Sequence, residues 1–413
     1  MSRLPKSSLA SRQAAVPFIL VTVLFDVLGF GLIIPVLPAL VGQFAQDPAS
    51  QSYWYGLLSA VYGLMQFVCA PLLGALSDRF GRRPVILISV FGLGLDFLLL
   101  AFAPSLTVIL LARVIGGATA ANFSVANAYI ADVTSGEERA RSFGLIGAAF
   151  GVGFILGPVI GGFLAVVDLR LPFFFASGLA ALNWCYGYFV LPESLPAERR
   201  SRFKLANANP FAALRGLARL QGVGGLVGVY AFSMLAQFVL YTVWVLYGTF
   251  RFGWGPEENG ASLFMAGVVS AVVQGGLLGM LLRRWGEMKA MQIGFCSAIV
   301  AYICYGLAQQ SWVMYCIIFG NFLAAISAPA IQGLISKAVD PKEQGVMMGA
   351  LTSINSVTMI VAPLIGAPML AEVSNLPKSD WRIGSVFFVC AGLQAIAWLL
   401  ALRLSGRKEF KAA

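Results

Sequence analysis

The chain has 413 residues, of which 59% are hydrophobic and only 11% are charged, and its formal net charge is +10. Soluble domains carry about 25% charged residues, and a soluble fold of this length could not bury so much apolar surface. These values exclude a water-soluble globular protein and indicate that the lipid bilayer is its solvent.

Twelve apolar segments follow one another along the chain, each long enough to cross a bilayer as a helix of about 20 residues. They cover residues 17–43, 52–76, 85–104, 105–131, 142–167, 171–191, 222–250, 259–282, 288–309, 311–336, 345–371 and 383–403. The first segment is too long for the core of a signal peptide, so we expect it to be retained as a helix. The predicted fold class is an all-α membrane protein with twelve transmembrane helices.

The loop charges predict the orientation of these helices. With the N-terminus in the cytoplasm, all but five of the 28 lysines and arginines fall on the cytoplasmic side. The exceptions are Arg170, Arg251, Lys378 and Arg382 in the opposite loops and Arg113 within a span. Because cytoplasmic loops are enriched in Lys and Arg, we expect both termini in the cytoplasm. The basic residues are spread over helix ends, which argues against nucleic acid as a partner.

Two stretches of the chain repeat each other. Residues 130–162 match residues 335–367 at a constant offset of 205, and a weaker match relates 74–83 to 279–287. The longest hydrophilic stretch, 192–221, lies between spans six and seven. We therefore predict two homologous six-helix bundles, 1–191 and 222–413, joined by a cytoplasmic linker at 192–221, with the substrate path between them.

A motif of glycines and charges follows span two. This loop motif comprises Gly74, Asp78, Arg79, Gly81, Arg82 and Arg83. Glycines let helices approach closely, Asp78 can cap the helix that follows, and the arginines can bridge to an acid such as Asp132 at the cytoplasmic end of span four. The motif resembles the signature loop of the major facilitator superfamily, which implies a latch that closes one side of a transporter. The alternative is a loop that only fixes the topology.

Span five carries a second motif, the glycine motif, which consists of Gly153, Gly157, Pro158, Gly161 and Gly162. Small residues four apart let helices pack closely in lipid, and proline adds a kink that neighbouring helices must accommodate. The pattern resembles the hallmark of drug/proton antiporters. The alternative is that it serves helix packing alone.

Three charged residues lie deep within the first six spans. They are Asp26 in span one, Asp96 in span three and Arg113 in span four. Arginine keeps its charge under essentially all conditions, so Arg113 requires a facing acid, and Asp26 and Asp96 are the two candidates. Because the chain has no histidine, carboxylates must carry any transported proton. Asp26 could take up a proton as substrate leaves and release it as substrate binds; the alternative is a static buried ion pair.

The last six spans contain polar side chains among aromatic ones instead of deep charges. The candidates for substrate binding are Gln237, Tyr241, Trp244, Gln274, Asn321, Gln332 and Asn355, together with Gln66 and Asn122 of the first half. This asymmetry suggests that one half handles protons and the other largely selects the substrate. Each of these residues could instead make a hydrogen bond between helices.

Nearly the whole chain resembles the tetracycline/proton antiporters of Gram-negative bacteria. The resemblance is carried by residues 24–38, 62–66, 76–84, 94–102, 244–246, 251–254 and 329–333. It implies transport roles for Asp26, Gln66, Asp78, Asp96 and Arg113. Ser270 and Ala298 stand where that family carries a histidine and an acid, and an uncharged pair of residues does not favour a magnesium chelate of tetracycline as the substrate. A tetracycline-like drug is the best single guess for the substrate, and another amphipathic compound is the alternative.

A proton-coupled symporter or a metabolite exporter could use the same fold, and a sensor or lipid-handling scaffold belongs to another class. A membrane enzyme is least supported, since the loops hold no nucleophile, metal-binding or acid–base constellation. The six cysteines form no CxxC pair, so we expect no metal site and no cofactor. The expected partners are protons, a small molecule and the lipid bilayer, and the expected state is a monomer.

Overall fold

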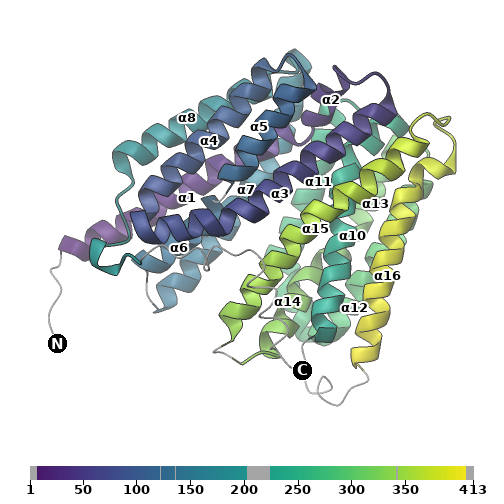
Figure 1. The fold of residues 1–413 in the computed structure, drawn as a ribbon. Coiled ribbons are helices and arrows are strands. Elements are labelled where there is room, and N and C mark those ends of the chain that lie inside the picture. Colours follow the sequence, from purple (N-terminus) through teal and green to yellow (C-terminus); the bar gives the residue numbers. More distant parts are fainter. Residues whose placement is uncertain (1–6, 121, 135, 202–223, 341–342, 406–413) are drawn as a thin grey trace. The chain divides into compact units, whose positions relative to one another are not determined.

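The computed structural model describes residues 7–120, 122–134, 136–201, 224–340 and 343–405, which form helices and their connecting loops (Figure 1). The first half contains α1 (Ser7–Ile33), α2 (Leu37–Gly42), α3 (Pro48–Phe80), α4 (Arg82–Phe102), α5 (Leu106–Thr119), α6 (Asn122–Val133), α7 (Gly136–Val167), α8 (Leu171–Val190) and η1 (Ala197–Arg199). The second half contains α10 (Gly224–Phe252), α11 (Pro256–Val272), the π-helical η3 (Val273–Leu277), α12 (Leu278–Leu307), α13 (Ser311–Gly320), η4 (Asn321–Ile326), α14 (Ser327–Lys337), α15 (Gln344–Val373), η5 (Trp381–Gly384) and α16 (Ser385–Ser405). Helices suit this chain because hydrocarbon offers no partner for backbone groups, and a helix satisfies its own.

The number of spans depends on one glycine. Among the described residues, eleven helical stretches are long and apolar enough to cross a membrane, and one of them, Pro256–Leu307, has 52 residues. A continuous helix of that length would measure about 78 Å, more than twice the hydrocarbon thickness of about 30 Å. Gly286 interrupts the stretch with φ 71° and ψ 161°, a conformation that glycine adopts at little cost. The stretch therefore contains two spans, and the prediction of twelve transmembrane helices is confirmed.

Spans four and ten are each interrupted inside the apolar segment that was predicted from the sequence. Ala120 leaves the helical conformation between α5 and α6, with ψ 41°. The 3₁₀ segment η4 separates α13 from α14 at the equivalent place in the repeat. Irregular backbone inside a membrane protein needs new hydrogen-bond partners, and the carbonyl oxygen of Ala120 accepts one from Nε2 of Gln66 at 3.4 Å. Gln66 thereby supports the break in span four.

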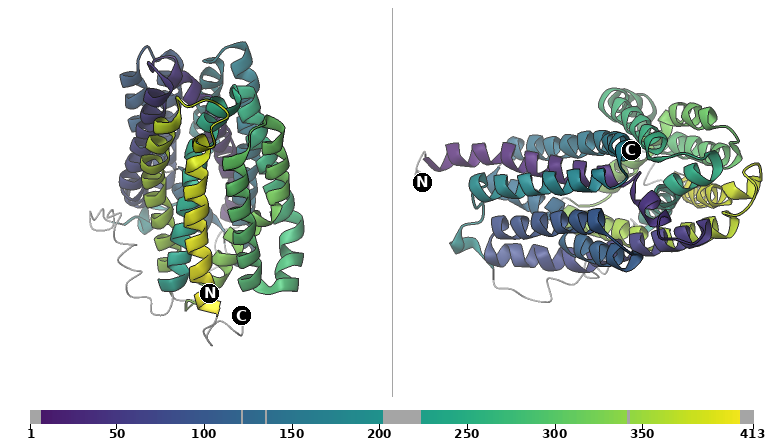
Figure 2. Two further views of the ribbon diagram at one scale, coloured as in Figure 1. Left: turned by 90° about the vertical axis from the view of Figure 1, so that its right-hand side faces the viewer. Right: turned by 90° about the horizontal axis from the view of Figure 1, so that it is seen from above.

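The described residues divide into two compact units, one within 1–40 and 64–209 and the other within 41–63 and 210–413. In the first unit α1 packs against α7 and α8, and α4 against α5 and α8; in the second, α10 packs against α15 and α16. Figure 2 shows helices running side by side within each unit. Residues 41–63 belong to the second unit because α3 touches α15 there, where a Cβ on Gly56 would overlap Ala367. The domain limits at 191 and 222 stay a prediction.

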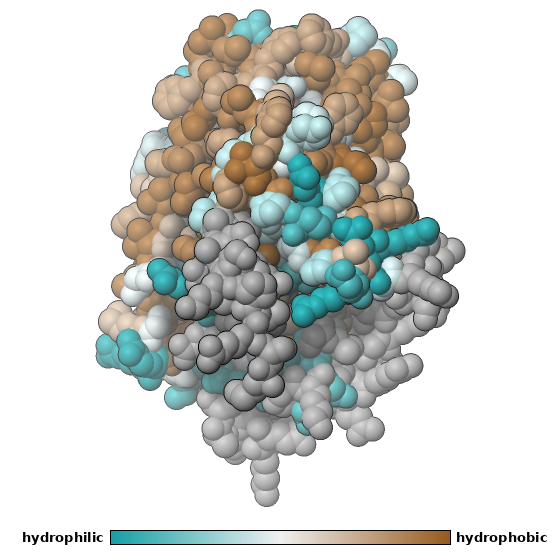
Figure 3. Space-filling model, turned by 90° about the vertical axis from the view of Figure 1, so that its left-hand side faces the viewer, coloured by the Kyte–Doolittle hydropathy of each residue, from teal (hydrophilic) through white to brown (hydrophobic). Residues whose placement is uncertain are grey.

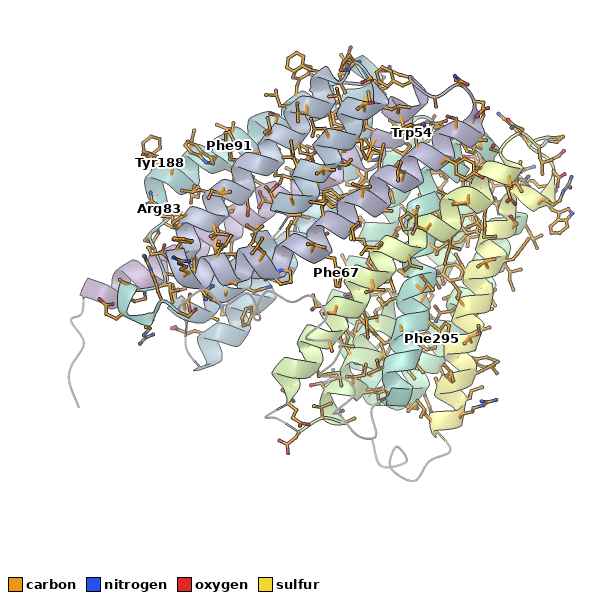
Figure 4. The ribbon with its side chains drawn as sticks, viewed as in Figure 1. Trp54, Phe67, Arg83, Phe91, Tyr188 and Phe295 are labelled. Atoms are coloured by element: carbon orange, nitrogen blue, oxygen red, sulfur yellow. The ribbon has the colours of Figure 1, made fainter. Side chains whose placement is uncertain are left out.

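Hydrophobic side chains cover the outside of the protein as well as its core. Phe91 on α4 is 61% exposed, whereas Phe295 of the second unit is fully buried (Figure 4). Phe189 on α8 is 78% exposed. The face drawn in Figure 3 is largely hydrophobic, and hydrophilic residues gather toward one end of it. Large exposed apolar surface on a folded chain marks contact with another apolar medium, which here is lipid.

Candidate functional site

The deep charges of the first unit include an ion pair between α4 and α5. Asp96 is fully buried and Arg113 is 3% exposed, and Nη2 of Arg113 donates to Oδ2 of Asp96. A Cβ on Gly116 would overlap this carboxylate, so the glycine one turn after Arg113 makes room for the pair. Removing two ions from water costs several kcal/mol each, which pairing offsets in part. Of the two acids proposed for Arg113, the structure places Asp96 against it.

Asp26 on α1 accepts a hydrogen bond from Asn183 on α8, with Nδ2 and Oδ1 3.1 Å apart. The same nitrogen lies 3.2 Å from the carbonyl oxygen of Thr22, one turn earlier on α1. Asn183 is 1% exposed. It is absent from the residues predicted from the sequence, where its one signal is a lone asparagine inside the apolar run 171–191.

The glycine motif of α7 packs directly against the helix that carries Asp26. A Cβ on Gly153 would lie 3.0 Å from the backbone nitrogen of Leu28, and one on Gly157 would lie 2.7 Å from Cα of Gly31. Gly161 likewise meets the backbone of α1, and Pro158 and Gly162 are buried beside it. The contact is backbone against backbone, as expected for small residues in lipid. A role of the motif in antiport stays a prediction.

Replacing Gly157 by alanine should destabilise the protein, because the added methyl group meets the backbone of α1 and neither helix can move aside cheaply. Overpacking of this kind costs about 1–3 kcal/mol, which thermal unfolding in detergent would detect. Gly151→Ala on the same helix is the matched control, since a Cβ there meets no described atom within 4 Å. Equal unfolding midpoints for the two variants would contradict the close contact.

Arg82 is the centre of the loop motif. Its Nε lies 3.0 Å from Oδ2 of Asp132 and its Nη1 lies 2.6 Å from Oδ1 of Asp78, so the predicted bridge to span four is present in the structure. Asp78 was expected to cap α4, and this expectation is wrong, because the side chain pairs with Arg82 instead. A Cβ on Gly74 would meet no described atom within 4 Å, so close helix contact does not require glycine there.

The first turn of α4 is capped by Glu193, a residue 111 positions away that the sequence prediction assigns only to the linker. Its Oε1 accepts from the backbone N–H of Arg82 at 2.8 Å, and its Oε2 accepts from that of Arg83 at 3.3 Å. A carboxylate at a helix N-terminus satisfies unpaired N–H groups and complements the helix dipole. Gly81 has φ 106°, and a Cβ on it would overlap this carboxylate.

The other two arginines of the loop motif contact aromatic rings. The guanidinium of Arg83 lies over the ring of Tyr188, 5.9 Å from its centroid, and donates to the Tyr188 carbonyl at the end of α8 (Figure 4). Arg79 lies over the ring of Phe80 at 4.9 Å. Arg82 and Arg83 therefore join the loop motif to three other segments of the first unit: the end of α6, the end of α8 and the residues that follow α8.

Glu193→Ala should lower the stability of the first unit, because two backbone donors of α4 lose their acceptor. The loss of hydrogen bonds to a charged group is worth about 1.5–3 kcal/mol and would appear as a lower unfolding midpoint. Glu198→Ala in the same loop provides the control, since Glu198 is exposed. The capping role is contradicted when both variants unfold at the wild-type temperature.

The second unit holds an ion pair at the positions equivalent to those of Arg82 and Asp132, with the charges exchanged. Glu287 and Lys337 lie 205 residues after that first pair, and Nζ of Lys337 is 2.9 Å from Oε1 of Glu287. The glycine before each loop residue has a positive φ, 106° in the first unit and 71° in the second. The weak match of 74–83 to 279–287 therefore marks a repeated structure.

Two of the predicted substrate-binding residues join one cluster in the second unit. Trp244 packs edge-to-face against Tyr305, with ring centroids 5.1 Å apart, and donates from Nε1 to Ser262 at 2.9 Å. Asn321 accepts from Ser297 at 2.9 Å and hydrogen-bonds with Tyr305. Tyr305 was not predicted; its tyrosine ring links Trp244 of α10 to Asn321 at the break in span ten.

The other candidates are distributed over both units. Asn355 accepts from the hydroxyl of Tyr230 at 2.9 Å, and Gln274 donates to Ser270 at 2.6 Å beside the π-helical turn η3. Gln237 hydrogen-bonds with Tyr241, which is 48% exposed. Gln332 is exposed. Gln66 bonds the break in span four, and the side chain of Asn122 lies outside the described residues.

Comparisons with known proteins agree with this architecture. A family model described as the Major Facilitator Superfamily matches residues 19–363. The class C tetracycline resistance protein of Escherichia coli is 39% identical over 92% of this chain and 96% of its own length, and the class B protein of Escherichia coli is 34% identical over 94% and 97%. The solved structure of the human organic anion transporter MFSD10 (TETRAN) has 26% identity and a TM-score of 0.68, with 96% of this chain and 100% of that chain covered.

Proposed function

Because this chain belongs to the Major Facilitator Superfamily, we propose that it is a proton-coupled antiporter that exports a small amphipathic compound, with a tetracycline-like drug as its substrate. The observation that carries the proposal is the similarity to tetracycline resistance proteins, which extends through both units. The positive loops support a position in a bacterial inner membrane with both termini in the cytoplasm.

The first unit would carry the transported proton. Asp26 is the carrier, since it is a carboxylate within a span, is held by a neighbouring helix, and belongs to a chain without histidine. It takes up a proton as the drug leaves on the outer side and releases it as the next drug binds from the cytoplasm. Asp96 and Arg113 keep a fixed pair of charges in the same unit.

The second unit would supply most of the drug contacts. Tyr241, which is 48% exposed, and its hydrogen-bond partner Gln237 combine an aromatic ring with an amide, which suits the fused rings and the polar edge of a tetracycline-like molecule. Trp244 and Tyr305 are buried and would hold Asn321 in place. Ala298 provides no acid in span nine, so a metal chelate of the drug would find no charged partner at that position. Drug recognition here would then use uncharged hydrogen-bonding groups.

The two ion pairs of opposite polarity would act as cytoplasmic latches, one in each unit. Arg82–Asp132 and Glu287–Lys337 each join the loop after the second span of a unit to the end of its fourth span. Lys337 is 61% exposed, so its pair with Glu287 is weak, about 0–1 kcal/mol, and can open and close during a transport cycle without a large barrier. The Arg82 and Asp132 side chains are only 10% and 23% exposed, so that pair is the more firmly held of the two.

Transport in membrane vesicles tests the proposed function. The chain would be expressed in a bacterium that lacks its main efflux pumps, and inside-out vesicles would be given an acid interior. Antiport predicts that tetracycline accumulates in the vesicles, with Mg²⁺ present or chelated, and that the cells become resistant. A symporter would deplete the vesicle interior under the same gradient, and that result would overturn the proposal.

A further inference from the structure

Asn183 of α8 donates hydrogen bonds to two acceptors on one turn of α1. Its Nδ2 reaches both the carbonyl oxygen of Thr22, at 3.2 Å, and the carboxylate of Asp26, at 3.1 Å. These two acceptors lie four residues apart, which is one helical turn. The amide group is 1% exposed, so neither water nor lipid replaces either contact.

The orientation of the amide follows from its neighbours. Both groups that face it are acceptors, and an asparagine side chain offers them donors only through its NH₂ group. The carbonyl oxygen Oδ1 of the same amide is buried and has no hydrogen-bond partner among the described residues. A buried polar atom left unsatisfied costs about 1–3 kcal/mol. The two hydrogen bonds that Nδ2 donates therefore hold the side chain in this orientation, although Oδ1 is left without a partner among the described residues.

The opposite side of the same stretch of α1 is held by α7. A Cβ on Gly153 would lie 3.0 Å from both the backbone nitrogen of Leu28 and Cβ of Val27. The two helices are therefore in close contact immediately after Asp26, and α1 has no room to move toward α7. A change at Asp26 therefore acts on the other side of α1, where Asn183 of α8 contacts it.

We propose that Asn183 is the positioning residue of the proton carrier: its amide holds the charged Asp26 against α8 and loosens that contact when Asp26 becomes protonated. The inference rests on the proposed function, in which Asp26 carries the proton. A hydrogen bond to a charged acceptor is roughly twice as strong as one to a neutral acceptor. Protonation of Asp26 therefore weakens one of the two hydrogen bonds between α1 and α8, while the bond to the Thr22 carbonyl stays. In this way the binding of a proton changes the packing of α1 against α8.

Two transport measurements on the full-length protein in liposomes test the inference. One is the accumulation of labelled tetracycline driven by a pH gradient, and the other is the exchange of labelled for unlabelled tetracycline without a gradient. Asn183→Leu removes both donors and keeps the branched shape of the side chain, and Asn183→Ala removes them without steric demand. We expect either variant to lose about tenfold in accumulation relative to exchange, the change that one lost hydrogen bond to a charged group predicts.

Ser177→Ala is the matched control for a hydrogen bond of α8 that does not involve Asp26. Its hydroxyl donates to the carbonyl of Gly94 on α4 at 3.2 Å, so its loss should leave the ratio of accumulation to exchange unchanged. A purely structural role of Asn183 would lower both measurements in proportion, and that outcome, or an unchanged ratio in both Asn183 variants, overturns the inference.

A third arm separates this inference from the proposed function. If the Asp26→Asn variant still accumulates tetracycline, Asp26 is not the proton carrier, and the positioning role of Asn183 is overturned as well. Loss of accumulation in Asp26→Asn together with an unchanged ratio in the Asn183 variants would overturn the positioning role alone.

Discussion

Replacing Asp26 by asparagine should abolish the accumulation of drug that a pH gradient drives, while the protein stays folded and still binds drug. The substitution removes the proton acceptor but keeps a neutral oxygen that can accept from Asn183, as the protonated carboxyl group does, so α1 and α8 stay joined by a weaker hydrogen bond. One proton moving down one pH unit supplies about 1.36 kcal/mol, which supports roughly tenfold accumulation. Uptake into inside-out vesicles with the membrane potential clamped should fall from that value to no accumulation.

The control for Asp26→Asn is Glu198→Gln, which removes an exposed carboxylate from the loop after α8. That variant should accumulate drug as the wild type does. Full drug resistance and undiminished accumulation in Asp26→Asn would refute the role of Asp26 as carrier. Loss of both drug binding and accumulation would indicate a structural role instead.

Arg113→Gln should be the most destabilising single change among the charged residues of the first unit. It leaves the fully buried carboxylate of Asp96 without its cation. Removing one partner of a buried pair costs about 3–5 kcal/mol, enough to reduce the yield of folded protein in the membrane. The measurement is the amount of monodisperse protein in detergent and its thermal unfolding midpoint.

The double variant Asp96→Asn/Arg113→Gln separates the loss of stability from the loss of transport. It removes both charges, so most of the stability should return, because a neutral polar pair avoids the uncompensated charge. Transport should stay impaired if the two charges take part in proton coupling. A double variant that is as unstable as Arg113→Gln would contradict the ion pair as the cause.

Apolar length and loop charge were sufficient to predict the twelve spans. In lipid the backbone must satisfy its polar groups within a helix or a closed barrel, and an unbroken run of about 20 apolar residues fits the helix. The two breaks, at Ala120 and in η4, were not predictable from hydropathy, since small apolar residues there look like those of any span. The interrupted helix at Gly286 was predictable, because a glycine lies between two arginines and a glutamate in the middle of a run of 52 residues.

The sequence by itself determined that this is a polytopic membrane protein of two related halves, with three deep charges in the first half and none evident in the second. It also identified the loop motif and Asp132 as a partner for its arginines, and the structure shows that Arg82 is the arginine that reaches Asp132. Only the tertiary structure decided which groups meet across helices: Asp96 with Arg113, and Asn183 with Asp26. The physical reason is that hydropathy depends only on the composition of one segment, which decides whether that segment is stable in lipid. Which side chains meet between two helices depends on the rotation of each helix about its axis and on the position of one helix along the other. In this chain those are set by backbone contacts such as that of the α7 glycines with α1.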